Sequence, residues 1–140
     1  MNTEAAIISL QQLSAGRKQL CKQHLQALNG LTQALGKKDR YTQAHGQRVA
    51  IYAMRLARRL GFTPQAIRDV GIGGLFHDVG KLALSDRIFT NRENRLPNDL
   101  RQEVNCHPLI GAALLKDISF LKPVVDFVLF HHEREDGNGY

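Results

Sequence analysis

Apolar side chains recur along most of the chain at the three-to-four-residue spacing of an α-helix. From Val49 to Leu60 they stand at positions i, i+3, i+4, i+7, i+8 and i+11, which places them on one face of a helix that ends at Gly61. Thr63 and Pro64 predict the start of the next helix, because threonine is a frequent N-cap and proline is favoured in the first turn. No stretch of useful length alternates apolar and polar residues as a strand does. We therefore predict an all-α fold.

Further helices are expected in the second half of the chain. One begins at Asn98 and carries apolar residues as far as Leu115, and the last begins at Pro123 and continues through apolar residues to Phe130. Residues 84–97 are polar and irregular, which is typical of a loop. We expect this loop to lie between two helices.

The first quarter of the chain predicts a long helix of its own. Apolar residues with spacings of 4, 3 and 7 share one helical face: Cys21, Leu25, Leu28 and Leu35. Residues 4–36 therefore form one long helix, or two helices broken near Gly16. We divide the chain into an N-terminal helical segment, residues 1–36, and a domain, residues 37–140. Such a helix packs on its own domain, connects it to an upstream sensor, or joins two copies of the chain into a homodimer.

Length and composition exclude several classes of protein. A chain of 140 residues suits a single compact domain, and a hydrophobic content of 43% excludes a disordered tail. No apolar run reaches the roughly 18 residues of a membrane span, and the first residues do not resemble a secretory signal. Cys21 and Cys106 form no CxxC pair and are expected to be reduced thiols. We therefore expect a cytoplasmic protein without a membrane span.

The formal net charge is +6, from 19 Lys and Arg against 13 Asp and Glu. An excess of positive charge favours partners that carry phosphate groups. The sequence has neither zinc-finger spacing nor a strip of aromatic residues that would stack on bases. DNA is therefore not an expected partner.

Histidines carry the candidate chemistry. Of the six in the chain, His24 lies in the N-terminal segment and is interpreted as a hydrogen-bonded packing residue. The other five lie at or near the ends of predicted helices or beside another type of ligand: His45, His77, His107, His131 and His132. Asp78 follows His77 and offers a carboxylate that can bridge two metal ions. This set exceeds the four ligands of a closed zinc site and fits two divalent ions that share Asp78, an arrangement suited to phosphate-ester hydrolysis.

The segment His77–Lys81 is the centre of this constellation. Gly80 permits close approach of the backbone at the end of a helix. Lys81 either binds phosphate and neutralises charge on the leaving group, or interacts with a helix dipole as a C-terminal lysine. The first interpretation is favoured, because a lysine beside two cations is repelled unless an anion fills the site.

Four sequence elements, in this order and at these spacings, resemble the HD-GYP branch of the HD superfamily of metal-dependent phosphohydrolases. They are Asp39–His45, His77–Lys81 followed by Asp86, His107–Gly111, and His131–Tyr140, which reads HHEREDGNGY. The resemblance implies an all-α HD-domain helical bundle, preceded here by the long N-terminal helix, with two or sometimes three iron or manganese ions. It also implies hydrolysis of cyclic di-GMP in bacterial second-messenger signalling, so the expected substrate is a cyclic dinucleotide.

Carried over by position, the resemblance implies a role for each residue. His45, His77 and Asp78 hold one divalent transition-metal ion, and Asp78 bridges to a second ion that has further ligands: His107, His131 and His132. Asp78 and Lys81 are the predicted catalytic residues, with Lys81 at the scissile phosphate. A loop that binds the substrate or a signalling-protein partner contains the remaining predicted residues: Asp136, Gly137, Gly139 and Tyr140.

The sequence departs from the family at several positions. Tyr41 stands four residues before His45, where members with a third metal carry glutamate, so we expect two ions and not three. Asn91–Glu93 replaces an expected Lys-Pro-Gly turn. The family's later aspartate, which completes the first metal site, and its Arg-containing substrate motif do not follow Tyr140. We therefore expect residues 37–140 to be a C-terminally incomplete HD-GYP-like domain.

Other functions are consistent with the same residues. A regulatory or binding module of the HD type would bind a ligand or partner with little or no catalysis, and the departure at Asn91–Glu93 and the long N-terminal helix favour it. Another HD-type hydrolase would act on nucleotides or (p)ppGpp, but simpler HD enzymes need only a His…His-Asp…Asp core. The paired His131 and His132 and the Gly-x-Gly-Tyr ending argue against it. We therefore predict a metal-dependent phosphodiesterase.

Overall fold

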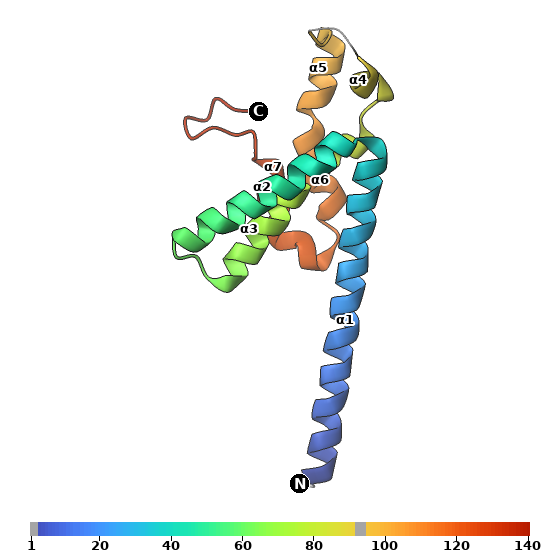
Figure 1. Cartoon of the computed structure of the whole chain (residues 1–140), viewed down its shortest axis with the longest axis vertical. Coiled ribbons are helices and arrows are strands. Elements are labelled where there is room, and N and C mark those ends of the chain that lie inside the picture. Colours follow the sequence, from blue (N-terminus) through green and yellow to red (C-terminus); the bar gives the residue numbers. More distant parts are fainter. Residues whose placement is uncertain (1–2, 92–94) are drawn as a thin grey trace. The chain divides into compact units, whose positions relative to one another are not determined.

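The computed structural model describes residues 3–91 and 95–140; the side chains of residues 3–15, 17, 21 and 25 lie outside this description. Every regular element in the described residues is a helix, which confirms the all-α prediction. The elements are α1 (Thr3–Lys38), α2 (Arg40–Arg59), α3 (Pro64–Phe76), the 3-10 helix η1 (Val79–Ala83), α4 (Asp86–Thr90), α5 (Asn98–Asn105), α6 (His107–Leu115), the 3-10 helix η2 (Ser119–Val124) and α7 (Val125–Leu129) (Figure 1).

Two compact units make up the chain, the first reaching to Leu31 and the second spanning Thr32–Tyr140. α1 is one uninterrupted helix, so the single-helix prediction for the N-terminal segment is the correct one. The end of α1, from Thr32, belongs to the second unit, and the domain boundary after residue 36 stays a prediction. No helix in the described residues has the length and apolar character needed to cross a lipid bilayer.

Some of the sequence predictions concern residues outside the described part of the chain. The thiol of Cys21 is one of these, whereas Cys106 is a free and exposed cysteine. The departure at Asn91–Glu93 is another, because its last two residues are not described. The reduced state of Cys21 and the altered turn at Asn91–Glu93 therefore stay predictions.

α2 ends and α3 begins at the residues that the sequence predicts. The carboxylate of Asp39 accepts hydrogen bonds from two backbone N–H groups in the first turn of α2 and so caps this helix. Gly61 follows α2 with a φ of 75°, a conformation that glycine adopts without strain. The hydroxyl of Thr63 accepts a hydrogen bond from the N–H of Ala66 at 3.2 Å, so Thr63 caps α3 as predicted.

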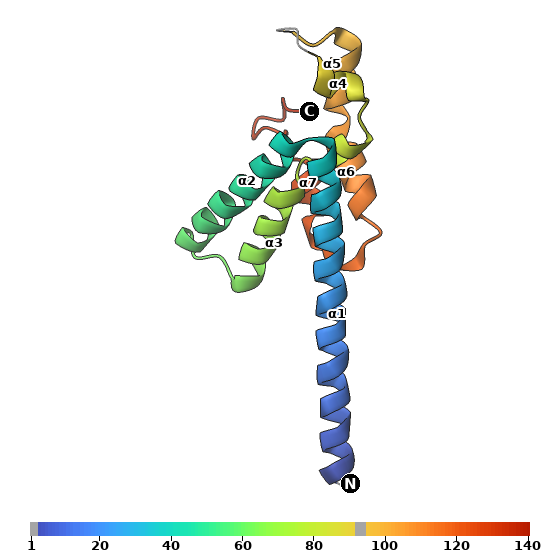
Figure 2. The same cartoon turned by 45° about the vertical axis from the view of Figure 1, so that its right-hand side comes forward.

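α2 and α3 lie side by side and run in opposite directions (Figures 1 and 2). Gly46 makes their close packing possible, because a β-carbon at this position would lie only 2.6 Å from the carbonyl oxygen of Leu75. Ala50 and Ala57 on α2 are buried. Small residues on α2 therefore bring the start of α2, which carries His45, against the end of α3.

Only part of the apolar stripe predicted on α2 is covered. Ala57 is 3% exposed, whereas the large members of the stripe remain mostly in solvent, at 65% for Tyr52, 61% for Leu56 and 64% for Leu60. α3 packs against the small residues of α2, so these larger side chains lie outside the contact. The period of the stripe predicted the helix correctly but not how much of its apolar face is buried.

The prediction of one helix from Asn98 to Leu115 is wrong, because the chain forms two helices there. α5 ends at Asn105 and α6 begins at His107, with Pro108 in the first turn of α6. Proline has no N–H group with which to continue the hydrogen-bond ladder of α5, so the helix breaks at this point. The break brings His107 to the start of a helix.

Two shorter segments also differ from the sequence prediction. Residues 84–97, predicted as a loop, contain the short helix α4. The last helix does not begin at Pro123, which lies inside η2, and α7 follows from Val125. Proline fits the 3-10 helix, but the α-helical ladder can start only after it.

The core of the second unit lies where α3, η1, α6, η2 and α7 meet. Side chains at most 1% exposed come from all five elements: Phe76, Val79, Leu115, Leu121, Val124 and Val128. Close packing of these side chains holds the C-terminal ends of α3 and α7 near η1. Those ends carry most of the predicted ligands.

Candidate metal centre

The structure brings the predicted ligands of the second unit together in two groups. The donor atoms of His45, His77 and Asp78 all lie within 4.8 Å of one another. The same holds for the donor atoms of the other group: His107, His131 and His132. His24, on α1, belongs to neither group. The groups divide the residues as the resemblance implies.

Asp78 lies between the two groups and is only 4% exposed. Its Oδ2 atom is 3.4 Å from Nε2 of His77. Its Oδ1 atom is 3.1 Å from Nε2 of His107 and 3.9 Å from Nε2 of His131. The two carboxylate oxygens therefore face different histidine groups, which is the geometry that a bridging carboxylate needs.

Three of the imidazoles are held in orientation by hydrogen bonds to the backbone. Each bonds to the carbonyl of the residue three positions earlier in the chain. In each case the Nδ1–H group donates the hydrogen bond, at 2.8 Å in His77, 2.6 Å in His107 and 2.7 Å in His131. The acceptors lie in the last turns of α3, α5 and α7: Gly74, Val104 and Val128. Carbonyl groups in the last turn of a helix lack an N–H partner from that helix, so they are available to accept from the histidines; the carbonyl of Val104 also accepts a backbone N–H at the end of α5.

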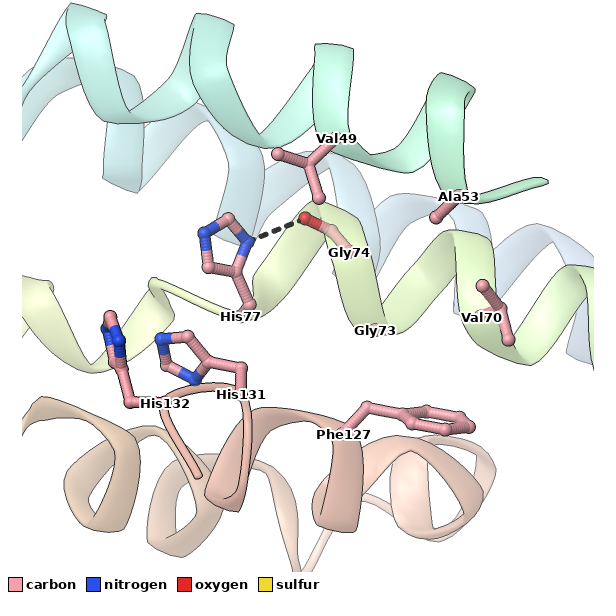
Figure 3. Close-up of a pocket in the computed structure, with 9 residues that line it drawn as sticks. All are labelled: Val49, Ala53, Val70, Gly73, Gly74, His77, Phe127, His131 and His132. Carbon is pink, nitrogen blue, oxygen red and sulfur yellow. Dashed lines mark hydrogen bonds between the residues drawn. The ribbon is translucent and has the colours of Figure 1, made fainter. Parts of the chain in front are cut away.

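The consequence of these hydrogen bonds is chemical as well as structural. With Nδ1 protonated and held, Nε2 is the atom left to bind a metal ion, and the carbonyl acts as the outer partner that fixes the ring. Figure 3 shows the ring of His77 held at Gly74 and the rings of His131 and His132 approaching it from the opposite side. The imidazoles thus converge through their Nε2 edges.

The Nε2 atoms of His107 and His131 lie 3.1 Å apart. Because Nδ1 carries the proton in both rings, two neutral imidazoles here would direct their lone pairs at each other and at Asp78. A shared cation, either a proton or a metal ion, removes this repulsion. Two nitrogen ligands bound at about 2.1 Å and at right angles lie roughly 3 Å apart, so the observed spacing fits a single metal ion.

The charge states of the site follow from burial and from these contacts. Burial alone would raise the pKa of Asp78, but its close contacts with the imidazoles of His107 and His77 and with the ammonium of Lys81 outweigh it and hold this pKa below its usual range. Burial lowers the pKa of His131 to about 4, and it also lowers the pKa of His45. Asp78 is therefore an anion at neutral pH and His131 and His45 are neutral, as metal ligands must be.

Not every imidazole shifts in the same direction. Burial lowers the pKa of His132, and the charge of His107 lowers it further. Burial opposes protonation of His77, but the hydrogen bond to Asp78 outweighs it and raises the pKa of His77. A metal ion at this position would take the place of that proton.

Lys81 lies beside the same carboxylate. Its Nζ atom is 2.8 Å from Oδ2 of Asp78. η1 carries it, and η1 packs closely on α6, because a β-carbon on Gly80 would lie 2.6 Å from the amide nitrogen of Gly111 and would overlap the carbonyl oxygen of His107. Gly80 therefore permits the contact that places Asp78 and Lys81 beside His107.

The C-terminal segment folds back on the second histidine group. The carboxylate of Glu133 accepts a hydrogen bond from the N–H of Gly139 at 2.8 Å. The ring of Tyr140 stacks on His132, with centroids 4.5 Å apart and planes 14° from parallel. Glycine is needed at position 139, because a β-carbon there would meet the backbone and side chain of Glu133. Of the loop residues predicted from sequence, Tyr140 thus reaches the ligand groups.

The other predicted loop residues shape the turn. Gly137 has a φ of 71°, which favours glycine. Asp136 is exposed, and the guanidinium of Arg134 donates hydrogen bonds to its carboxylate at 2.9 and 2.6 Å. Hydrogen bonds from Arg134 and Asn138 lower the pKa of this carboxyl. Asp136 and Gly137 therefore set the conformation that returns the chain to His132.

A cleft of about 440 Å³ opens onto the histidines between α2, α3 and α7. Its walls are apolar: Val49, Ala53, Val70 and Phe127. Figure 3 shows Ala53, Val70 and Phe127 toward the right of the view and the three histidines toward its left, with Val49 above His77. The ligand groups are therefore reached from an apolar surface.

Sequence reasoning missed the residues that support this site. The carbonyls that orient the histidines have no side-chain signal, and they became visible only once the helix ends were known. Glu103 on α5 also escaped notice: its carboxylate accepts hydrogen bonds from the N–H and the hydroxyl of Ser85. This contact ties α5 to the segment that follows η1.

Comparison with known families agrees with the geometry of this centre. The family model described as HD domain matches residues 10–140. The chain belongs to the HD domain family. HD domains bind divalent metals, and the two ligand groups of this HD domain are able to do so.

Curated relatives of this HD domain are named as phosphodiesterases. The cyclic di-GMP phosphodiesterase PA4108 of Pseudomonas aeruginosa is 39% identical over 118 residues, which cover 84% of this chain and 28% of the relative. The cyclic di-GMP phosphodiesterase response regulator RpfG of Xanthomonas campestris is 30% identical over 132 residues, 93% of this chain and 35% of the relative. The 3'3'-cGAMP-specific phosphodiesterase 3 of Vibrio cholerae is 31% identical over 117 residues, 81% of this chain and 25% of the relative.

These relatives confirm the resemblance to the HD-GYP type that the sequence elements indicated. The HD domain chain spans between a quarter and about a third of the length of these relatives. Similarity is thus shown for this part of each relative.

Proposed function

We propose that this HD domain holds two divalent transition-metal ions, of the iron or manganese type, in its two ligand groups. The observation that carries the proposal is the position of Asp78, with Oδ2 3.4 Å from His77 and Oδ1 3.1 Å from His107. A carboxylate between two sets of imidazoles is suited to bridge two ions. His45, His77 and Asp78 would hold the first ion. The second would have Asp78 and the other group: His107, His131 and His132.

The reaction that we propose is hydrolysis of a phosphodiester bond in a cyclic dinucleotide. The relatives are named for cyclic di-GMP or for 3'3'-cGAMP, and both are cyclic dinucleotides. Cyclic di-GMP is therefore the first substrate to test. Bound ions would supply positive charge that stabilises the attacking and leaving oxygens of the phosphate.

Lys81 and Asp78 are the residues to which we assign catalytic roles. The ammonium of Lys81 lies 2.8 Å from Oδ2 of Asp78. When Asp78 shares its charge with two ions, its attraction for Lys81 weakens, and the ammonium is free to pair with a phosphate oxygen. Lys81 would then neutralise charge on the leaving group. The close packing at Gly80 supports this role, because it holds the backbone of η1 in place.

The segments that flank the ligand groups are proposed to bind partners. The loop that contains Asp136, Gly137, Gly139 and Tyr140 would contact the substrate or a signalling protein, since Tyr140 stacks on His132 and is still 49% exposed. Residues 1–36 would act as a connector or a homodimerisation helix. A cytoplasmic location stays a prediction.

Metal analysis and a hydrolysis assay on the 140-residue chain test the proposal. We expect two equivalents of manganese or iron per chain and conversion of cyclic di-GMP to a linear product, followed by chromatography. Asp78→Asn is expected to lose both properties. His24→Gln, a histidine substitution outside both ligand groups, is the matched control and should retain them.

Other outcomes of the same experiment have a clear meaning. A folded chain that takes up no metal would contradict the proposal. Bound metal and bound cyclic di-GMP without hydrolysis would favour the regulatory or binding module instead. Release of product from another nucleotide but not from a cyclic dinucleotide would contradict the proposed substrate class.

A further inference from the structure

A row of aromatic rings runs through the two ligand groups and ends in tyrosine on both sides. Each ring contacts the next in the order Tyr41, His45, His77, His131, His132 and Tyr140. At one end Tyr140 belongs to the loop already assigned to partners. At the other end Tyr41 has no part in the site described above.

The ring of Tyr41 faces solvent at the edge of the first ligand group. It is parallel to the ring of His45, with centroids 6.2 Å apart, and its residue is 73% exposed. The two residues are four positions apart and so lie on the same face of α2. An exposed aromatic face thus continues the line of the ligand imidazoles outward.

Local structure holds Tyr41 in this position. Its N–H donates a hydrogen bond to the carboxylate of Asp39 at 2.9 Å, within the N-cap of α2. The backbone of the first turn is therefore fixed, and only the tyrosine side chain has rotational freedom left to lose on binding. Tyrosine loses little conformational entropy for the contact area that it offers, so it is an efficient platform for a flat ligand.

Charge at the start of α2 favours a ligand with phosphate groups. Lys37 and Arg40 are exposed beside Tyr41 in the sequence. The carboxylate of Asp39 is engaged in the cap, and Lys38 pairs with Asp86. The exposed cations therefore give the Tyr41 end of the row of aromatic rings an excess of positive charge.

We propose that Tyr41 is a substrate-binding residue on which one nucleobase of the cyclic dinucleotide stacks while a phosphate lies at the ligand groups. This inference rests on the proposed function and adds the subsite for the base. Every nucleobase has a π-face, so stacking on Tyr41 would favour a nucleotide over a simple phosphate without choosing between guanine and adenine. A ribose separates base and phosphate in a nucleotide, and the ring of Tyr41 lies 6.2 Å between centroids from His45, a member of the first ligand group.

Binding measurements on the manganese-loaded 140-residue chain test this subsite. The probes are a hydrolysis-resistant phosphorothioate analogue of cyclic di-GMP and, as a probe without a base, inorganic phosphate. We expect Tyr41→Ala to weaken binding of the dinucleotide analogue by about 5- to 150-fold, the usual range for loss of one base–aromatic stack. Binding of inorganic phosphate should not change, and Tyr41→Phe, which keeps the aromatic face, should bind both probes as the wild type does.

Tyr52→Ala is the matched control, because Tyr52 is another exposed tyrosine on α2, at 65%, and lies about two helical turns beyond His45, on the side away from Tyr41. It should bind both probes as the wild type does. The chain has three tyrosines and no tryptophan, so tyrosine fluorescence provides a second readout. The dinucleotide analogue should quench it in the wild type and in Tyr52→Ala, and much less in Tyr41→Ala.

Three other results would each contradict base stacking on Tyr41 for a different reason. Unchanged dinucleotide binding in Tyr41→Ala would exclude a stacking role. Equal weakening of both probes, together with loss of bound manganese, would make Tyr41 a residue that positions His45. A wild-type chain that binds manganese and phosphate but not the dinucleotide analogue would contradict the proposed function itself, whatever the behaviour of the variants.

Discussion

The carbonyl oxygen of His107 lies against the α-carbon of Gly80, in the space that a β-carbon would occupy. The amide nitrogen of Gly111 lies 2.6 Å from the same point. η1 and α6 can touch in this way only because residue 80 is glycine. The contact also brings His107 to Asp78, with Nε2 3.1 Å from Oδ1. Gly80, two residues after Asp78, therefore permits the packing that brings the metal-ligand residues together.

Gly80→Ala is expected to lower the free energy of unfolding by about 2–4 kcal/mol, because the added methyl group would meet backbone atoms that no side-chain rotation can move. Denaturation by urea, followed by the helical circular dichroism signal, measures the change. The manganese affinity of the folded fraction should fall as well, since His107 must shift away from Asp78.

Gly30→Ala is the control for this substitution, because a β-carbon at position 30 of α1 meets nothing within 4 Å. Alanine has the higher helix propensity, so this variant should be as stable as the wild type or more stable by up to about 1 kcal/mol. Wild-type stability and wild-type manganese affinity in Gly80→Ala would show that η1 and α6 are not held in the described contact.

Local sequence chemistry predicted those parts of the fold that local interactions determine. Thr63 and Gly61 marked helix ends correctly, since capping and a positive φ depend on neighbouring residues. The helix break before Pro108 was missed because apolar spacing continues through it. The exposure of Leu56 was missed too, since periodicity identifies an apolar face but not the element that covers it.

The same distinction between local and tertiary interactions applies to the candidate site. Sequence elements identified the residues that meet in the two groups, because their order and spacing carry the resemblance. The hydrogen bond from His131 to the carbonyl of Val128 was not predicted, since a backbone carbonyl becomes a partner only where a helix ends. The contact of Glu103 with Ser85 joins residues 18 positions apart and needs the tertiary fold. The roles of the residues in the two ligand groups stay predictions.

The two ligand groups should lose their ions separately. His45→Ala removes a ligand from the first group only, and His132→Ala removes one from the second only. We expect each variant to retain about one tightly bound manganese in place of two, because removing even an outer-shell partner typically weakens metal binding by about 10- to 100-fold. Elemental analysis after gel filtration measures the ratio of metal to protein.

Asp78→Asn completes this comparison, because Asp78 faces both groups and its loss should weaken both ions together. Circular dichroism on the three variants confirms that they are folded. Loss of both ions from His45→Ala alone, with the fold intact, would contradict two separable groups that share one carboxylate.

Removal of metal should destabilise the second unit. The Nε2 atoms of His107 and His131 are 3.1 Å apart, and a metal ion between them replaces repulsion by two bonds. At a free manganese concentration 100 times its dissociation constant, binding to the folded state alone adds about 2.7 kcal/mol of stability. A chelator should therefore lower the midpoint of thermal unfolding of the wild type by several degrees, and restoring manganese should reverse the change.

Asp78→Asn serves as the reference for the chelator experiment. It should unfold at nearly the same temperature with and without the chelator, because it has lost the ligand that both groups share. An equal chelator effect in this variant and in the wild type would place the bound metal elsewhere in the chain.

Glu103 offers a test of how the segment after η1 is anchored. Its two carboxylate oxygens accept hydrogen bonds from the N–H and from the hydroxyl of Ser85, the latter at 3.0 Å. Glu103→Ala leaves both donors without this acceptor and should lower the free energy of unfolding by about 1–3 kcal/mol. Glu103→Gln keeps a carbonyl oxygen for the N–H and an amide that can donate to the hydroxyl, so it should lose less than about 1 kcal/mol. Urea denaturation of both variants beside the exposed-site control Glu135→Ala measures the difference. Wild-type stability of Glu103→Ala would mean that the contact with Ser85 contributes nothing to the fold.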